Sequence, residues 1–164
     1  MRVLFRGWGV TPNQRAFLDM IAVSEIGPKL LAVTDNGYNV IVGSTPAKPI
    51  LFDSYADHPR RLIKINERLS STAAGRYQLL ARYFNHYRDL LDLPDFSPAS
   101  QDAIAMQQVK ECRAFAAIEA GDLNEAVRKC AHIWASLPGA GYGQHENSIG
   151  TLLAAYMAAG GKVA

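Results

Sequence analysis

One carboxylate in this sequence lies where a purely structural role explains it poorly. Residues 11–27 read Thr-Pro-Asn-Gln-Arg-Ala-Phe-Leu-Asp-Met-Ile-Ala-Val-Ser-Glu-Ile-Gly, and their apolar members share one face of a helix: Phe17, Leu18, Ile21 and Ala22. Glu25 continues this apolar stripe, four residues after Ile21. Burial and the negative end of the helix dipole would both raise the pKa of its carboxyl group. A carboxylic acid that stays protonated near neutral pH can act as a general acid, so Glu25 is the candidate catalytic residue.

The other reactive residue types form no recognisable constellation. Ser24 lies outside any Gly-x-Ser-x-Gly motif, and we expect it to form a local hydrogen bond at the helix end. Cys112 and Cys130 lack metal-ligand spacing, which favours reduced and largely buried thiols. The four histidines are scattered without an HExxH pattern, so neither a metal site nor a cofactor is expected.

A glycine-rich segment at 139–143 reads Gly-Ala-Gly-Tyr-Gly. It follows a helical pattern rather than a strand and lacks Gly-Lys-Ser/Thr, so a nucleotide site is not indicated. The glycines instead favour a loop that allows close backbone approach and projects Tyr142.

Length and composition indicate one ordinary globular domain spanning residues 1–164. The residues are 49% hydrophobic and 20% charged, and the formal net charge of +2 is too small for a nucleic-acid partner. No apolar run approaches the ~20 residues of a membrane span, so membrane insertion is not expected. The apolar run near the N-terminus is interrupted by Arg6 and does not predict a signal peptide.

Helix and turn signals predict where the regular elements lie. Thr11, Pro12 and Gln14 form the start of a helix over 11–27, which Gly27-Pro28 stops. A loop is expected over 28–36. The β-branched run 38–42 and the segment 49–52 predict a small antiparallel hairpin or three-stranded sheet within 38–55, the only β structure expected. Segment 60–69 is predicted to be an irregular helix or extended loop. Helices are predicted at 76–91, 98–109, 115–120, 122–134 and 147–160, with a break near 111–113.

The helix start near residue 76 carries side chains that suit a sugar. Small residues at 72–75 permit close approach, and Tyr77 and Gln78 offer an aromatic ring and an amide. An amide binds hydroxyl or N-acetyl groups, and a ring stacks on a pyranose.

The order of catalytic glutamate, β hairpin and helical segment resembles the lysozyme superfamily, and within it the bacteriophage lambda endolysin family. The resemblance covers about residues 14–163. It rests on Gly-Arg-Tyr-Gln-Leu-Leu at 75–80 and on Ile-Trp-Ala-Ser-Leu-Pro-Gly-Ala-Gly-Tyr-Gly-Gln at 133–144. Further matching blocks lie at 16–20, 24–25, 37–43, 57–60, 71–72, 96–98 and 100–103.

The resemblance implies an α+β, lysozyme-like fold in which a helical bundle, with a lobe at about 76–160, carries a small antiparallel β wing at about 37–55. It also implies a peptidoglycan lytic transglycosylase, which cleaves the β-1,4 bond between N-acetylmuramic acid and N-acetylglucosamine with one glutamate and leaves a 1,6-anhydro end. Glu25 matches that glutamate. The residues expected to line the substrate cleft are Tyr38, Asn39, Thr72, Tyr77, Gln78 and Tyr142. The implied partners are peptidoglycan strands and a separate holin, which releases the enzyme from the host cytoplasm to the periplasmic wall.

Two alternatives remain open. A muramidase of the same fold would use a second carboxylate, such as Asp35 or Asp53, and the neutral Asn39 in the wing favours the single-glutamate route. A non-catalytic wall-binding module is the other alternative. The chain also departs from the family at Ile26-Gly27-Pro28, where Gly-Thr is usual, and has extra wing residues at 44–48.

Overall fold

The computed structural model describes residues 9–164, and the expectations about residues 1–8 lie outside them. The described chain has the α+β composition that the sequence predicts. It divides into two compact units, one formed by Ile26–Ile104 and the other by residues 9–25 with Ala105–Ala164. The single domain of 1–164 therefore stays a prediction. Within residues 9–164, no helix combines the length and the apolar character needed to cross a bilayer.

The first helix has the start and the end that its sequence predicts. α1 (Pro12–Ile26) begins with a capping box, in which the Gln14 N–H donates to Thr11 Oγ1 at 3.1 Å and the Thr11 N–H donates to Gln14 Oε1 at 3.3 Å. Gly27 ends it with a φ of +84°. The loop predicted for 28–36 is wrong in its first half, because α2 (Pro28–Ala32) begins there with a proline pre-set for a first helical turn.

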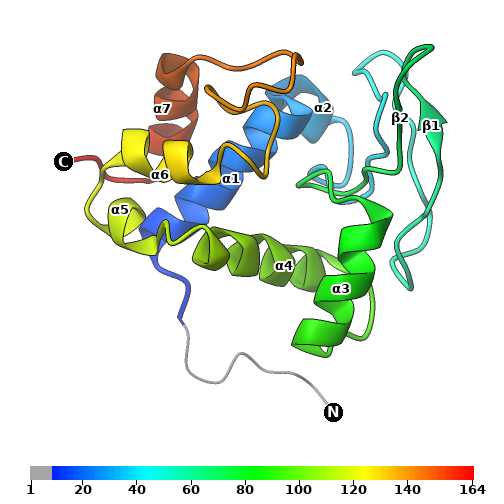
Figure 1. Ribbon diagram of the computed structural model, residues 1–164, viewed down its shortest axis with the longest axis horizontal. Coiled ribbons are helices and arrows are strands. Elements are labelled where there is room, and N and C mark those ends of the chain that lie inside the picture. Colours follow the sequence, from blue (N-terminus) through cyan, green and yellow to red (C-terminus); the bar gives the residue numbers. More distant parts are fainter. Residues whose placement is uncertain (1–8) are drawn as a thin grey trace. The chain divides into compact units, whose positions relative to one another are not determined.

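The β wing lies later in the chain than predicted. Its two strands are β1 (Ile63–Lys64) and β2 (Ser70–Ser71), which pair antiparallel with Ile63 opposite Ser71. Figure 1 shows them side by side. β1 falls within 60–69, where an irregular helix or extended loop is predicted, and β2 follows directly after that segment.

The strands predicted at 38–42 and 49–52 reduce to isolated bridges, one of which joins Val40 to Leu51. The Ser44 hydroxyl explains the loss, since it donates to Ile41 O at 2.6 Å and accepts the Ile50 N–H at 2.9 Å. These side-chain bonds occupy backbone groups that a regular ladder would use.

The helix predicted from Arg76 begins only at Ala81. Residues 74–79 instead form a tight turn, in which Ala74 and Leu79 exchange backbone hydrogen bonds of 3.0 and 2.9 Å. Gln78 has a left-handed φ of +51°, which no helix accommodates. α3 (Ala81–Leu91) then runs to Asp92, another left-handed residue. Tyr77 and Gln78 therefore lie in a turn ahead of the helix, and not in its first turn.

An aromatic cluster forms the core of the unit Ile26–Ile104. Phe84 and Phe96 are fully buried with ring centroids 5.0 Å apart. His58 packs against both rings, accepts the Arg60 N–H at Nδ1 and lies 2.9 Å from Leu79 O through Nε2. This pattern fits a neutral imidazole with its proton on Nε2, and burial lowers the pKa of His58.

Helices provide the regular structure of the second unit. α4 (Pro98–Glu111) enters it from the first unit and ends at the predicted break, where Arg113 has a φ of +56°. α5 (Phe115–Glu119) and α6 (Leu123–Cys130) follow closely, as Figure 1 shows. α6 ends before the predicted Trp134. α7 (Ile149–Ala158) begins after Ser148, whose hydroxyl accepts the Thr151 N–H at 3.1 Å.

Both cysteines are free thiols, as predicted. Cys130 is fully buried and Cys112 is partly exposed, with its sulfur 3.9 Å from His132 Nε2.

Candidate active site

Glu25 lies in the last turn of α1, at the end of the buried stripe. Burial raises the pKa of its carboxyl group, and hydrogen bonds from Ser136 oppose that rise. The direction agrees with the sequence argument for a carboxylic acid that keeps its proton. The arrangement can therefore deliver a proton and afterwards hold the resulting negative charge.

A series of hydrogen-bonded polar side chains in the same unit leads to Glu25, and Ser136 is the member that contacts it. The Ser136 hydroxyl donates to Glu25 Oε1 at 2.5 Å. Ser24 Oγ lies 2.7 Å from Ser136 Oγ, and the Asn147 amide donates to Ser24 Oγ at 3.0 Å and to Ser24 O at 3.2 Å. Ser24 lies at the helix end and is hydrogen-bonded, as predicted, but the expectation of a local bond is wrong, because its side-chain partners Ser136 and Asn147 come from a distant part of the chain.

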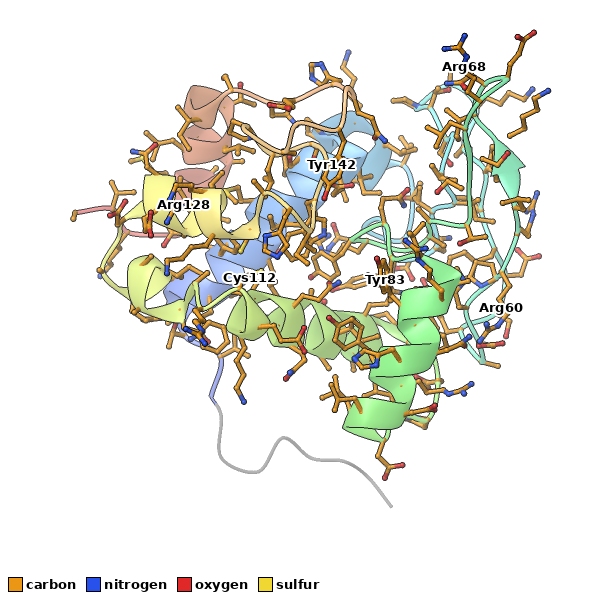
Figure 2. The ribbon with its side chains drawn as sticks, in the orientation of Figure 1. Arg60, Arg68, Tyr83, Cys112, Arg128 and Tyr142 are labelled. Atoms are coloured by element: carbon orange, nitrogen blue, oxygen red, sulfur yellow. The ribbon has the colours of Figure 1, made fainter. Side chains whose placement is uncertain are left out.

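The glycine-rich segment is a loop closed by its own hydrogen bonds. At its base, the Asn147 N–H donates to Ser136 O at 2.8 Å. Within it, the Glu146 carboxylate accepts the Gly139 N–H at 2.9 Å and the Gly141 N–H at 3.1 Å. Figure 2 shows Tyr142 on this loop; its side chain is 56% exposed, and its hydroxyl donates to His132 O. The exposed ring agrees with the prediction that the loop projects Tyr142.

Glu146→Ala should loosen the glycine-rich loop. The two glycine N–H groups lower the pKa of Glu146, so their bonds persist above the ordinary titration range of a glutamate and are lost as the pH falls through the lowered pKa. We expect the Gly139 and Gly141 amides to exchange with solvent about fivefold faster in the variant at neutral pH. Amide exchange by NMR measures this, and Glu67→Ala, which removes an exposed carboxylate in the other unit, is the control. Unchanged exchange in Glu146→Ala would contradict the assignment.

Two predicted sugar-binding tyrosines of the first unit share one acceptor. The Tyr38 and Tyr77 hydroxyls donate to Asp102 Oδ1 at 2.9 and 2.7 Å. Burial and the Asp102 carboxylate raise the pKa of Tyr38 to about 12. Tyr77 is 6% exposed, so its ring is chiefly a packing element, whereas Tyr38 is half-buried. A sugar contact stays a prediction for both.

The other three candidates of the first unit are partly exposed and bonded to nearby backbone. Asn39 Oδ1 accepts the Asp35 N–H at 3.1 Å, and Thr72 Oγ1 accepts the N–H of Ala81 at the start of α3. The Gln78 amide donates to Gly75 O at 2.9 Å. These contacts fix the three side chains, and substrate binding by them stays a prediction.

Sequence reasoning missed the residues that hold these side chains. Ser136 is 111 residues from Glu25, and no motif spacing connects the two. Gln101 also carries no recognisable sequence signal. Its buried amide accepts the Arg76 N–H and donates to Tyr38 O and Phe96 O. Only the family blocks at 100–103 and 133–144 drew attention to these positions.

Comparison with known proteins gives concordant matches. A family model described as Endolysin matches residues 15–163. The endolysin of Escherichia phage lambda is 53% identical over 153 residues, which is 92% of this chain and 94% of the relative. The endolysin of Escherichia phage P2 is 47% identical over 154 residues, with 91% and 93% covered.

Solved structures match as well. The bacteriophage lambda lysozyme in complex with a chitohexasaccharide aligns with a TM-score of 0.89 at 48% identity, covering 96% of this chain and 99% of the solved one. A second structure of lysozyme from bacteriophage lambda aligns with a TM-score of 0.85. The lysozyme-like fold predicted from the sequence is confirmed.

Proposed function

Because this chain belongs to the Endolysin family, we propose that it degrades peptidoglycan as a lytic transglycosylase with Glu25 as the one acid and base. The observation that carries the proposal is the carboxyl group of Glu25, whose pKa is raised by burial and whose Oε1 accepts the Ser136 hydroxyl. The substrate bond is the β-1,4 linkage between N-acetylmuramic acid and N-acetylglucosamine.

The reaction needs two proton transfers at the same carboxyl group. Protonated Glu25 first gives its proton to the glycosidic oxygen, and the bond from this oxygen to C1 of the muramyl sugar breaks. The carboxylate then takes the proton of the C6 hydroxyl, and the C6 oxygen closes onto C1. The products are a free hydroxyl on the leaving sugar and a 1,6-anhydro muramyl end, and no water is consumed.

The acids near the predicted wing support a single-glutamate route. The usual glycosidase mechanisms require a second carboxylate as a nucleophile or base. The Asp35 carboxylate accepts a hydrogen bond from the Tyr55 hydroxyl, which is a structural role. Asn39 is neutral. Asp53 is an exposed residue in the bend after Phe52.

The substrate class is supported by the relative whose structure holds a chitohexasaccharide. On this chain we assign glycan contact to Tyr38, Asn39, Thr72, Gln78 and Tyr142, and Tyr77, which is buried, acts on Tyr38 through their shared acceptor Asp102. Tyr142 offers the most exposed ring of this set for stacking on a sugar.

The mass of the digestion products tests the reaction type. Purified peptidoglycan treated with the protein should yield muropeptides that are lighter by one water than reducing-end muropeptides, and borohydride should leave them unreduced because an anhydro end has no free aldehyde. Digestion by a known muramidase is the control. Reducing-end products would instead establish a muramidase of the same fold.

The site of action follows from the proposed substrate. The protein would accumulate in the host cytoplasm and reach the periplasmic wall through a separate holin. Lysis of cells expressing the protein should therefore require a co-expressed pore-forming protein, or disruption of the inner membrane with chloroform.

A further inference from the structure

The contacts around Glu25 define the direction of a hydrogen-bond chain. A serine hydroxyl has one proton to donate. With Ser136 as the donor to Glu25 Oε1 at 2.5 Å, the one proton of its hydroxyl is used, so Ser24 is the donor in the 2.7 Å contact between the two serines. The Asn147 amide donates to Ser24 Oγ at 3.0 Å, which occupies one of the two acceptor lone pairs of that oxygen. The chain thus runs from Asn147 through Ser24 and Ser136 to the carboxyl group.

We propose that Ser136 is a positioning residue, aligned by Ser24 and Asn147, that keeps the transferable proton of Glu25 on Oε2. A neutral carboxyl group has one carbonyl oxygen and one hydroxyl oxygen, and the carbonyl oxygen is the better acceptor for a donor such as Ser136. Ser136 occupies Oε1 in this way, so the proton resides on Oε2. The inference rests on the proposed function only in taking Glu25 as the acid, and it applies equally to a transglycosylase and to a muramidase.

The same bond serves the site after the proton has left. A hydrogen bond to a carboxylate is stronger than one to a neutral acid. Ser136 therefore stabilises the anion formed by the first transfer without any change of rotamer, and Oε2 stays the oxygen that takes back the second proton. Both halves of the reaction then use one oxygen of one side chain.

Asn147 does not contact Glu25; its role is to orient the two serines. Its side-chain nitrogen donates to Ser24 Oγ and Ser24 O, and its backbone N–H donates to Ser136 O at 2.8 Å. These bonds hold both serines and the base of the glycine-rich loop in one arrangement. Without the amide, Ser24 Oγ has both lone pairs free and its orientation is no longer held, so the Ser136 hydroxyl turns away from Glu25 more readily.

The pH profile of activity is a suitable readout because few groups influence this carboxyl group. Among residues 9–164, the causes of the shift in the pKa of Glu25 are burial and the hydrogen bonds of Ser136, and no charged side chain is one of them. Removing the Ser136 hydroxyl should therefore raise the pKa of Glu25 further. A general acid with a higher pKa stays protonated to a higher pH, so the alkaline limb of kcat/KM moves upward.

The first experiment compares Ser136→Ala with Ser136→Thr in the full chain, using lysis of purified peptidoglycan across pH. Ser136→Ala should move the alkaline limb upward by about one pH unit and reduce the plateau of kcat/KM about tenfold. Ser136→Thr keeps the hydroxyl and should restore the limb of the wild type. An alanine variant with reduced activity and an unmoved limb would overturn the proposal, because it would reduce Ser136 to a packing residue.

The second experiment tests the chain behind Ser136 with a double-mutant cycle. Asn147→Leu should move the alkaline limb in the same direction by a smaller amount. In the Ser136→Ala background, Asn147→Leu should produce no further shift, since the proton it directs is gone. Fully additive shifts would overturn the coupling. Retention of activity by Glu25→Gln would instead defeat the proposed function, so the two failures are distinguishable.

Discussion

Glu25→Gln should abolish lysis of purified peptidoglycan, lowering the rate by about three orders of magnitude or more. The glutamine has nearly the shape of the glutamate and can still accept the Ser136 hydroxyl through its amide oxygen. It can neither donate a proton to the glycosidic oxygen nor accept one from a sugar hydroxyl. Both steps of the proposed reaction therefore fail together, and turbidity loss of a wall suspension measures the effect.

Stability measurements separate this loss from misfolding. Because burial raises the folded-state pKa of Glu25, the protonated form contributes stability that is complete below the unfolded-state pKa and is lost as the pH rises through the folded-state pKa. Glu25→Gln cannot ionise, so its melting temperature should match that of the wild type at acid pH and exceed it at alkaline pH. Unchanged lysis by a folded Glu25→Gln would remove Glu25 from the mechanism.

Gly75→Ala should destabilise the fold far more than an alanine at a left-handed glycine that has open space around it. Gly75 has a φ of +81°, and an added Cβ would collide with the buried Gln101 side chain, at 2.9 Å from Cδ, and lie 3.0 Å from Phe96 Cζ. Gln101 would have to give up hydrogen bonds to three backbone groups. We expect the free energy of unfolding to fall by about 3–5 kcal/mol, measured by urea denaturation.

Gly139→Ala is the matched control for this effect. Gly139 has a φ of +83°, almost that of Gly75, and an added Cβ would meet no atom within 4 Å. It incurs only the backbone cost of a left-handed alanine, about 1–2 kcal/mol. Equal losses in the two variants would show that backbone conformation alone, and not the Gln101 amide, makes Gly75 necessary.

The sequence predicted the elements whose signals are local. α1 was placed correctly because Thr11, Pro12 and Gln14 cap its start and Gly27 stops it, all within one segment. The wing was misplaced because the β-branched run at 38–42 has the propensity of a strand, while the Ser44 hydroxyl takes the backbone partners that a strand would need. A side-chain bond of this kind overrides propensity and leaves no periodic signal.

In the candidate site, too, the sequence predicted what has a local signal and missed what depends on contacts between distant residues. Glu25 was identifiable because a carboxylate on an apolar stripe conflicts with its local pattern. Ser136 and Asn147 could not be found in this way, because a serine and an asparagine near a glycine-rich loop fit their own surroundings without conflict. Their importance arises only where the fold brings them to Ser24 and Glu25.

The β1–β2 hairpin is short, which limits how far its own hydrogen bonds can keep it ordered. Two residue pairs make a ladder too short to be stable alone, and hairpins of this size form on a scale of about 1–10 μs. Its segment exposes Leu62, Ile65 and Leu69 beside basic residues, and Figure 2 shows Arg68 at the turn between the strands. The order of the hairpin therefore depends on its neighbours, among them the Val42 N–H, which donates to Ala73 O at 3.0 Å just after β2.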